Sequence, residues 1–281
     1  MGFVVVAAMA AAAVLVGSPA QATIYDKRND FNRDGVSDIP FILSGGGMMV
    51  QVGDGSGGVA RWADVGSGWF PYRYDLSAPG DLNRDGVGDL VSIHYDNGCL
   101  YRWYGNGNSG VSGGTQLGCG WDRYSLAGAG DLNNDGNGDL VAVNYDNGCL
   151  YRWYGNGSGG FGTGVQLGCS GWSSYAGALT GAGDLNGDGN ADLVGINDGN
   201  NCLYRFNGNG SGGFSSGVQV GCGWGNFTDI AGLGDFNRDG RGDLVALHSN
   251  GDLYRYHGNG SGGYASPSVI SVGMDGYFLA G

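Results

Sequence analysis

Five aspartate-rich segments of this chain share the pattern D-[LF]-N-x-D-G-x-x-D. Side-chain oxygens stand at positions 1, 3, 5 and 9, position 6 is glycine, and position 7 can offer its backbone carbonyl oxygen. Ca²⁺ takes about six to eight oxygen ligands in a flexible geometry, and a glycine permits a sharp turn around the ion. The pattern therefore predicts about five bound calcium ions. The predicted ligands are Asp30, Asn32, Asp34, Val36 and Asp38 in loop 1; Asp81, Asn83, Asp85, Val87 and Asp89 in loop 2; Asp131, Asn133, Asp135, Asn137 and Asp139 in loop 3; Asp184, Asn186, Asp188, Asn190 and Asp192 in loop 4; and Asp235, Asn237, Asp239, Arg241 and Asp243 in loop 5.

The charge of the chain agrees with this prediction. The formal net charge is −13, all 26 acidic residues are aspartates, and three in each of the five loops make fifteen of them ligands. The remaining aspartates nearly balance the 13 Lys and Arg residues, so the acidity does not imply a basic partner. A nucleic-acid partner is not expected either, because Lys27 is the only lysine and no basic run exists. The alternative is that the loops are Asp/Asn/Gly turns that bind nothing.

The loops mark a repeat whose starts lie 51, 50, 53 and 51 residues apart. A β-like run follows each loop, then a second such as CLYRWYGN, a third such as TQLGCGW, and a short fourth before the next loop. Four strands at a period near fifty are typical of a propeller blade. We therefore predict an all-β, five-bladed β-propeller of four-stranded blades over residues 23–281, with repeats starting near 24, 72, 124, 176 and 228. Residues 277–281 resemble 124–128 and are expected to complete the first blade, with residues 24–29 as the alternative.

Six cysteines form three pairs with the same separation of twenty residues. In an exported chain this spacing predicts disulfide bonds within blades, namely Cys99–Cys119, Cys149–Cys169 and Cys202–Cys222. If Cys99 faces Cys119 across an antiparallel pair, Tyr101 should face Leu117 and Trp103 should face Thr115.

Export is predicted from the first residues of the chain. Residues 3–16 are apolar and Ala20-Gln21-Ala22 suits a signal peptidase, so residues 1–22 are predicted to be a signal peptide. A membrane anchor is the alternative, although the run is shorter than the ~20 residues of a spanning helix. The mature chain is therefore expected to be secreted, extracellular and without a membrane span.

The loops resemble the FG-GAP/VCBS repeats of integrin-α-type β-propellers, and the resemblance covers residues 24–281. It implies a propeller fold with calcium bound between the first two strands of each blade, by the residues named above. The chain departs from the integrin pattern in having five units and intrablade disulfides. It looks more like bacterial secreted VCBS-repeat proteins and, less closely, like fungal lectins of this fold.

Repeated aromatic and arginine side chains indicate a binding function. Sugar platforms with neighbouring hydrogen-bond donors could be formed by Trp69, Trp121, Trp172, Trp224, Arg102, Arg152 and Arg205, with Tyr277 as the fifth aromatic copy. Repetition would make weak sites multivalent. The alternative is that these aromatics fill the core between blades.

An enzyme is the competing class of function. Glycosidases need paired carboxylates, and outside the loops the candidates shrink to residues such as Asp75 and Asp229. His94, His248 and His257 have no obvious nucleophile beside them in the sequence. We therefore expect a secreted, calcium-stabilised, lectin-like module that binds a glycan or an extracellular protein surface. The alternative is a secreted polysaccharide-active hydrolase or lyase.

Overall fold

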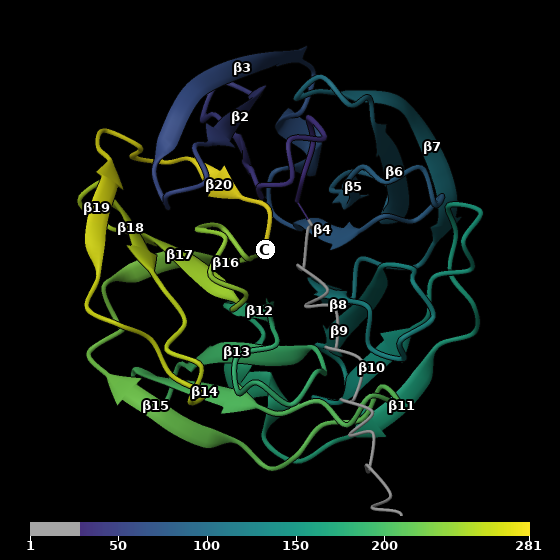
Figure 1. Ribbon diagram of the computed structural model, residues 1–281. Helices are drawn as coiled ribbons and strands as arrows, with labels where there is room; N and C mark the ends of the chain where they lie inside the picture. The colour runs from purple at the N-terminus through teal and green to yellow at the C-terminus, as the bar shows by residue number, and fades with distance from the viewer. Residues whose placement is uncertain (1–28) are drawn as a thin grey trace, which may run out of the picture.

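The computed structural model describes residues 29–281, which form five four-stranded antiparallel sheets in a ring (Figure 1). This confirms the prediction of a five-bladed, all-β propeller. The predicted signal peptide, residues 1–22, lies outside the described residues. Within residues 29–281, no helix is long and apolar enough to cross a bilayer.

Each blade is one sheet, numbered here from the N-terminus. Blade 1 holds β1 (Ile39–Ile42), β2 (Gly47–Gly53), β3 (Val59–Ser67) and β20 (Phe278–Leu279); blade 2 holds β4 (Leu76–Gly80), β5 (Asp89–His94), β6 (Cys99–Gly105) and β7 (Val111–Cys119); blade 3 holds β8 (Tyr124–Gly130), β9 (Asp139–Asn144), β10 (Leu150–Trp153) and β11 (Val165–Gly168); blade 4 holds β12 (Leu179–Gly183), β13 (Asp192–Asn197), β14 (Cys202–Phe206) and β15 (Val218–Cys222); and blade 5 holds β16 (Phe227–Gly234), β17 (Asp243–His248), β18 (Leu253–Tyr256) and β19 (Ser268–Ser271). Two short 3₁₀ turns, η1 (Phe70–Tyr72) and η2 (Trp172–Tyr175), precede β4 and β12.

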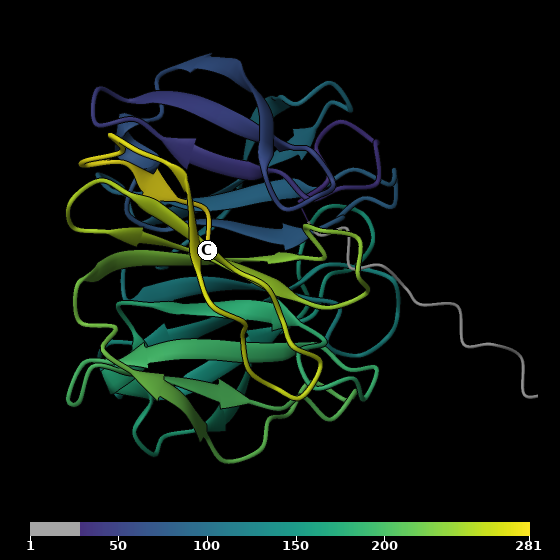
Figure 2. The same ribbon diagram turned by 60° about the vertical axis from the view of Figure 1, so that its left-hand side comes forward.

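The C-terminal strand closes the ring. β20 pairs antiparallel with β1, with Leu279 opposite Phe41, and the Ala280 N–H donates to the Pro40 carbonyl at 3.0 Å. Figure 2 shows β20, in yellow, beside the purple strands of blade 1. The predicted closing strand at residues 277–281 is confirmed. Closure pairs the innermost edge of blade 1, which would otherwise expose unpaired backbone groups.

The three predicted disulfides are present, each within one blade. The predicted strand register is correct at the cysteines but wrong beyond them. A β-bulge after Leu100 shifts the pairing by one residue, so Tyr101 lies opposite Gln116 and Arg102 opposite Thr115. The same shift recurs between β14 and β15 in blade 4. The extra residue of a bulge increases the local twist, and strict alternation of side chains does not reveal it.

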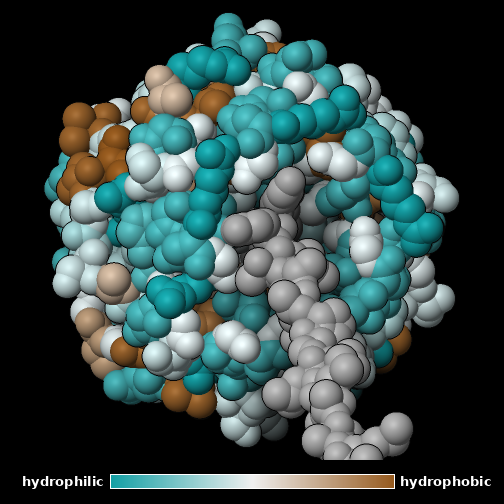
Figure 3. All heavy atoms as spheres, viewed as in Figure 1, coloured by the Kyte–Doolittle hydropathy of each residue, from teal (hydrophilic) through white to brown (hydrophobic). Residues whose placement is uncertain are grey.

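The hydrophobic core lies between the blades. Within residues 29–281 it forms five clusters, each combining residues of two neighbouring blades. The innermost strands approach each other so closely that only the smallest residues fit: a Cβ added at Gly232 would lie 1.6 Å from the Gly181 carbonyl oxygen. Outside the grey atoms, the face seen in Figure 3 is mainly hydrophilic, with hydrophobic residues in small patches.

Candidate functional site

In blades 2 to 5 the aspartate loops connect the first and second strands, and in blade 1 the loop leads directly into β1. In each loop the backbone wraps around the side-chain oxygens. In loop 2, Asp81 accepts hydrogen bonds from the N–H groups of Asn83 at 3.1 Å and Gly86 at 2.7 Å. Asn83 Oδ1 accepts from the Asp85 N–H, and Asp85 Oδ1 from the Val87 N–H, both at 2.9 Å. The bonds to positions 1, 3 and 5 recur in the other loops. In loop 2, Asp81 Oδ2, Asn83 Oδ1 and Asp85 Oδ1 each accept one of these bonds and keep a second lone pair, so they can still bind a cation.

The aspartate at position 9 of each loop also has a structural role that is not evident from the sequence. Asp89 is buried and uses both oxygens: Oδ2 accepts from the Leu82 N–H at 2.8 Å and Oδ1 from the Gly105 N–H at 2.9 Å. It thereby ties the loop to the end of β6. Burial, with a smaller effect of the nearby carboxylates of Asp81 and Asp85, raises the pKa of Asp89 to about 7. The same causes raise the pKa of Asp38 and Asp139 to about 7 and of Asp192 to about 6.

The loops fit a hard cation only with their complete donor set. Within residues 29–281, no three His, Cys, Asp or Glu side chains gather closely enough to form a metal site by themselves. A cation would therefore also need the amide oxygen of position 3 and the carbonyl of position 7. Mixed carboxylate, amide and carbonyl oxygens are the ligands that Ca²⁺ takes in proteins.

The four predicted tryptophans lie at the junctions between blades. Each packs against an aromatic ring of the next blade, with centroid distances of 4.7 Å for Trp69–Trp103, 4.8 Å for Trp121–Trp153, 4.5 Å for Trp172–Phe206 and 4.7 Å for Trp224–Tyr256. Trp69 and Trp224 are buried, whereas Trp121 and Trp172 are half-buried.

In blade 5 the position of these tryptophans is held by Met274. The expectation that Tyr277 is the fifth aromatic copy is therefore wrong. The Met274 N–H donates to the Gly251 carbonyl, as the Trp121 N–H does to that of Gly98. Tyr277 instead stacks on Phe41 at 5.5 Å. The aromatic series is therefore interrupted at the junction of blades 5 and 1.

The predicted arginines tie each blade to the glycine-rich turn of the next. Arg102 donates to the Gly159 carbonyl, Arg152 to that of Ser211 at 2.6 Å, and Arg205 to that of Ser261 at 3.4 Å. The receiving turn favours glycine because Gly262 has a φ of +84°, which L side chains rarely adopt, and a Cβ there would also overlap the Arg205 guanidinium. The structure thus gives these arginines partners inside the protein.

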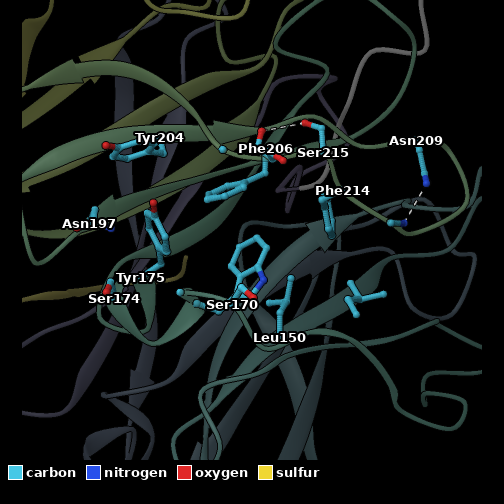
Figure 4. A pocket seen from close by; sticks show the side chains of 16 residues that line it. Leu150, Ser170, Ser174, Tyr175, Asn197, Tyr204, Phe206, Asn209, Phe214 and Ser215 are labelled. Carbon is cyan, nitrogen blue, oxygen red and sulfur yellow. Dashed lines mark hydrogen bonds between the residues drawn. The ribbon is translucent and has the colours of Figure 1, made fainter.

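A cavity of about 600 Å³ opens between blades 3 and 4 (Figure 4); we call it the 3/4 cavity. Its aromatic wall combines Trp172 of blade 3 with Phe206 of blade 4, whose ring also meets Tyr175 edge-on at 5.1 Å. Polar groups are supplied by Asn197, Asn209, Ser170, Ser174, Ser215 and Ser216, and no charged residue of the described chain lines it. Of the predicted ligand-binding residues, only Trp172 belongs to this cavity.

The 3/4 cavity lies at a position where the residue type changes between repeats. Phe206 stands where blades 2 and 3 have Trp103 and Trp153. In blade 3 the Trp153 indole lies against the start of β11, with Nε1 only 2.5 Å from a Cβ built on Gly164. The smaller phenyl ring leaves space beside Trp172. This exchange of Trp for Phe is the signal in the sequence that could have located the site.

The next junction carries a smaller version of the cavity, which we call the 4/5 cavity. It measures about 230 Å³ and is lined by Trp224, Tyr256, Asn259 and Tyr264, the counterparts of Trp172, Phe206, Asn209 and Phe214. Trp224 is thus the second predicted ligand-binding residue that lines a cavity.

Asp75 and Asp229 line a separate cavity of about 230 Å³ on the axis of the ring. Asp75 accepts from the Leu126 N–H at 3.4 Å, and Asp229 accepts from the Leu279 N–H at 2.8 Å. Each carboxylate therefore holds the innermost strand of the following blade. Burial raises the pKa of Asp75 to about 6 and that of Asp229 to about 7.

This burial predicts a pH effect on stability. The pKa of Asp229 is above its ordinary 3.8 in the folded state, so the folded chain binds the proton more tightly than the unfolded chain. Its contribution is complete below pH 4 and is lost as pH rises through about 7. Asp229→Asn stays neutral and can still accept from Leu279, so we expect it to raise the free energy of unfolding at pH 8 by about 1–3 kcal/mol. Urea unfolding of both proteins at pH 5 and pH 8, in calcium, measures this, and a variant that is less stable at pH 8 contradicts it.

The repeat of this chain matches a known family of repeats. The family model described as FG-GAP-like repeat matches residues 81–142 and 184–246, and both matches begin at the first aspartate of a loop. This chain is a five-bladed β-propeller that carries FG-GAP-like repeats. Each match runs from one aspartate loop through the rest of its blade and the whole next loop, and ends in β9 or β17.

The solved structures that resemble this propeller share little sequence with it. The BP39L lectin from Burkholderia pseudomallei matches at 15% identity and a TM-score of 0.50, covering 84% of this chain and 70% of that one. An Agrocybe aegerita lectin, described by its recognition of non-reducing terminal N-acetylglucosamine, matches at 19% identity and a TM-score of 0.48, covering 90% and 69%. AofleA from Arthrobotrys oligospora matches at 10% identity and a TM-score of 0.46, covering 91% and 90%. Among curated proteins, none matches the chain.

Proposed function

We propose that this FG-GAP-repeat propeller is a secreted glycan-binding protein that holds a neutral sugar in the 3/4 cavity and calcium in its loops. The observation that carries the proposal is the composition of that cavity. Its rings of Trp172, Phe206 and Phe214 offer apolar faces to the C–H surface of a sugar. Asn and Ser side chains at its edge can exchange hydrogen bonds with hydroxyl groups. Its volume suits a ligand of one or two sugar units.

The uncharged lining of the 3/4 cavity favours an uncharged ligand. Acidic and basic side chains do not line the 3/4 cavity within the described chain, so a charged sugar would lose its hydration without gaining a partner. A neutral sugar has no such cost. The 4/5 cavity supplies a second, smaller site one blade away, which would add avidity on a repeating glycan. The BP39L neighbour, a lectin by name, supports this class of function.

Calcium and secretion belong to the same proposal. The loops assemble oxygen donors that suit Ca²⁺, and five ions would bring the formal charge of −13 to about −3. Three disulfides support secretion, because such bonds form and persist in oxidising compartments.

A glycan array with wild type and Phe206→Trp tests the glycan part. Blades 2 and 3 already carry Trp at this position, so the variant should fold while its indole fills the 3/4 cavity. We expect wild type to bind neutral glycans and the variant to bind them at least about tenfold more weakly, a loss of ~1.4 kcal/mol. Tyr256→Trp, which fills the 4/5 cavity, is the matched control and should retain most of the affinity. Equal binding by wild type and Phe206→Trp would place the ligand elsewhere, and no neutral glycan bound by wild type would refute the proposed function.

A further inference from the structure

We propose that loop 4 is the tightest of the five cation sites, because within residues 29–281 it is the loop to which no basic side chain is bonded. This inference rests on the calcium part of the proposed function. Every loop presents the same donors: Asp at positions 1, 5 and 9, Asn at position 3 and a carbonyl at position 7. Differences in affinity must therefore come from the surroundings of the loops.

Loops 1, 2 and 3 each receive an arginine from the preceding loop. The arginines occupy position 4 of their own loops and extend across the junction between blades. Arg238 donates to the Asp34 carbonyl at 2.9 Å, Arg33 to the Asp85 carbonyl at 3.3 Å, and Arg84 Nε to Asn137 Oδ1 at 2.8 Å. In each case a positive charge lies beside a residue of the proposed ligand set.

Two basic residues of blade 5 lie beside loop 5, Arg241 from the loop itself and His257 from the segment after β18. Arg241 Nη1 lies 3.7 Å from Asp239 Oδ2, and His257 Nδ1 lies 3.4 Å from Asp243 Oδ1. The ring on His257 also contacts Asn237 Nδ2 at 3.0 Å. Three of the four side-chain donors of this loop are therefore in contact with a basic side chain.

Loop 4 has only neutral neighbours in these positions. The arginine of loops 1 and 2 is replaced in loop 3 by Asn134, whose Nδ2 lies 3.1 Å from a Cβ built on Gly210 of blade 4. The carboxylates of loop 4 bond within the loop: Asp184 accepts from the Asp188 and Gly189 N–H groups at 3.1 and 2.8 Å. Asn186 Nδ2 donates to Asp188 Oδ2 at 3.0 Å.

A neighbouring arginine weakens calcium binding in two ways. It repels the bound ion, and it relieves the repulsion among the carboxylates when the ion is absent. In a solvent-exposed loop a single guanidinium within several ångströms changes the affinity for a divalent ion by about three- to tenfold. Loop 4 has no such arginine, so it should bind its ion first as the calcium concentration rises.

The order of filling matters for the glycan site. Asp192 Oδ1, at position 9 of loop 4, accepts from the Gly208 N–H at 2.9 Å, and the adjacent Asn209 lines the 3/4 cavity. The tightest ion would therefore stabilise the turn that forms one wall of that cavity.

Calcium titration of the chelator-stripped full chain by isothermal calorimetry tests the ranking. We expect one ion to bind about three- to tenfold more tightly than the rest. Asp188→Asn in loop 4 should remove that tightest class, whereas the matched Asp85→Asn in loop 2 should leave it. Asn134→Arg leaves every ligand in place and should weaken the tightest class by about three- to tenfold, with the effect shrinking at high salt.

The possible results distinguish a failure of the affinity ranking from a failure of calcium binding itself. Five equal sites, or a tightest class that survives both Asp188→Asn and Asn134→Arg, would overturn the ranking while calcium binding stands. If stripped wild type takes up no calcium at all, the calcium part of the proposed function fails with it.

Discussion

Removal of calcium with EDTA is expected to lower the unfolding temperature of this propeller by about 20 °C or more. A ligand at a concentration of 100 times its dissociation constant adds ~2.7 kcal/mol per site, so five sites add on the order of 13 kcal/mol. For a chain of this size each kcal/mol moves the unfolding temperature by about 2–4 °C. Scanning calorimetry in 2 mM calcium and in excess EDTA measures the shift.

The physical reason is the place of the loops in the fold. Each loop places three aspartates within nine residues, and its position-9 aspartate, such as Asp139, bonds to the backbone N–H groups of Leu132 in the loop and of Gly155 just past β10. Without a cation the folded chain must keep these charges together. Magnesium added to the EDTA-treated protein is a useful control, because its smaller octahedral site should restore the stability only in part. Identical melting curves with and without EDTA would show that the loops are turns that bind no metal.

The second large effect is expected from Trp172→Ala. This change removes the aromatic wall that blade 3 contributes to the 3/4 cavity, and it should weaken binding of the best neutral glycan by about a hundredfold, or ~2.7 kcal/mol. Titration calorimetry with that glycan measures the loss. The free energy of unfolding should also fall by about 2–4 kcal/mol, since the ring packs against Phe206.

Trp121→Ala is the matched control for this prediction. Trp121 holds the same position one blade earlier, is also half-buried, and packs on Trp153 at 4.8 Å. It should lose comparable stability and keep glycan binding. If both variants bind the glycan equally weakly, the effect of Trp172→Ala comes from general loosening of the ring.

Much of the fold follows from the repeat in the sequence. A period near fifty with four β-like runs predicts the blade, and the likeness of residues 277–281 to 124–128 predicts the closing strand. Each blade is a local unit, so its strands and its disulfide can be inferred from nearby residues. The bulge after Leu100 could not be inferred, because one extra residue on β7 leaves the apolar pattern almost unchanged.

The parts that could not be predicted depend on contacts between blades. In the sequence, Arg205 resembles a ligand-binding residue. Only the fold shows that its guanidinium bonds to the turn of the next blade, 56 residues away. Asp229 offers a free carboxylate in the sequence, yet in the fold it holds Leu279. The 3/4 cavity arises from volume missing at Phe206, which the sequence records as one conservative change in a repeated triplet.

The most direct measurement is a crystal structure of the protein soaked with the best neutral glycan from the array. We expect a sugar ring over Trp172 between blades 3 and 4, with hydroxyl groups within hydrogen-bond distance of Asn209 or Asn197. A sugar bound in the axial cavity between Asp75 and Asp229, with the 3/4 cavity holding only water, would contradict it.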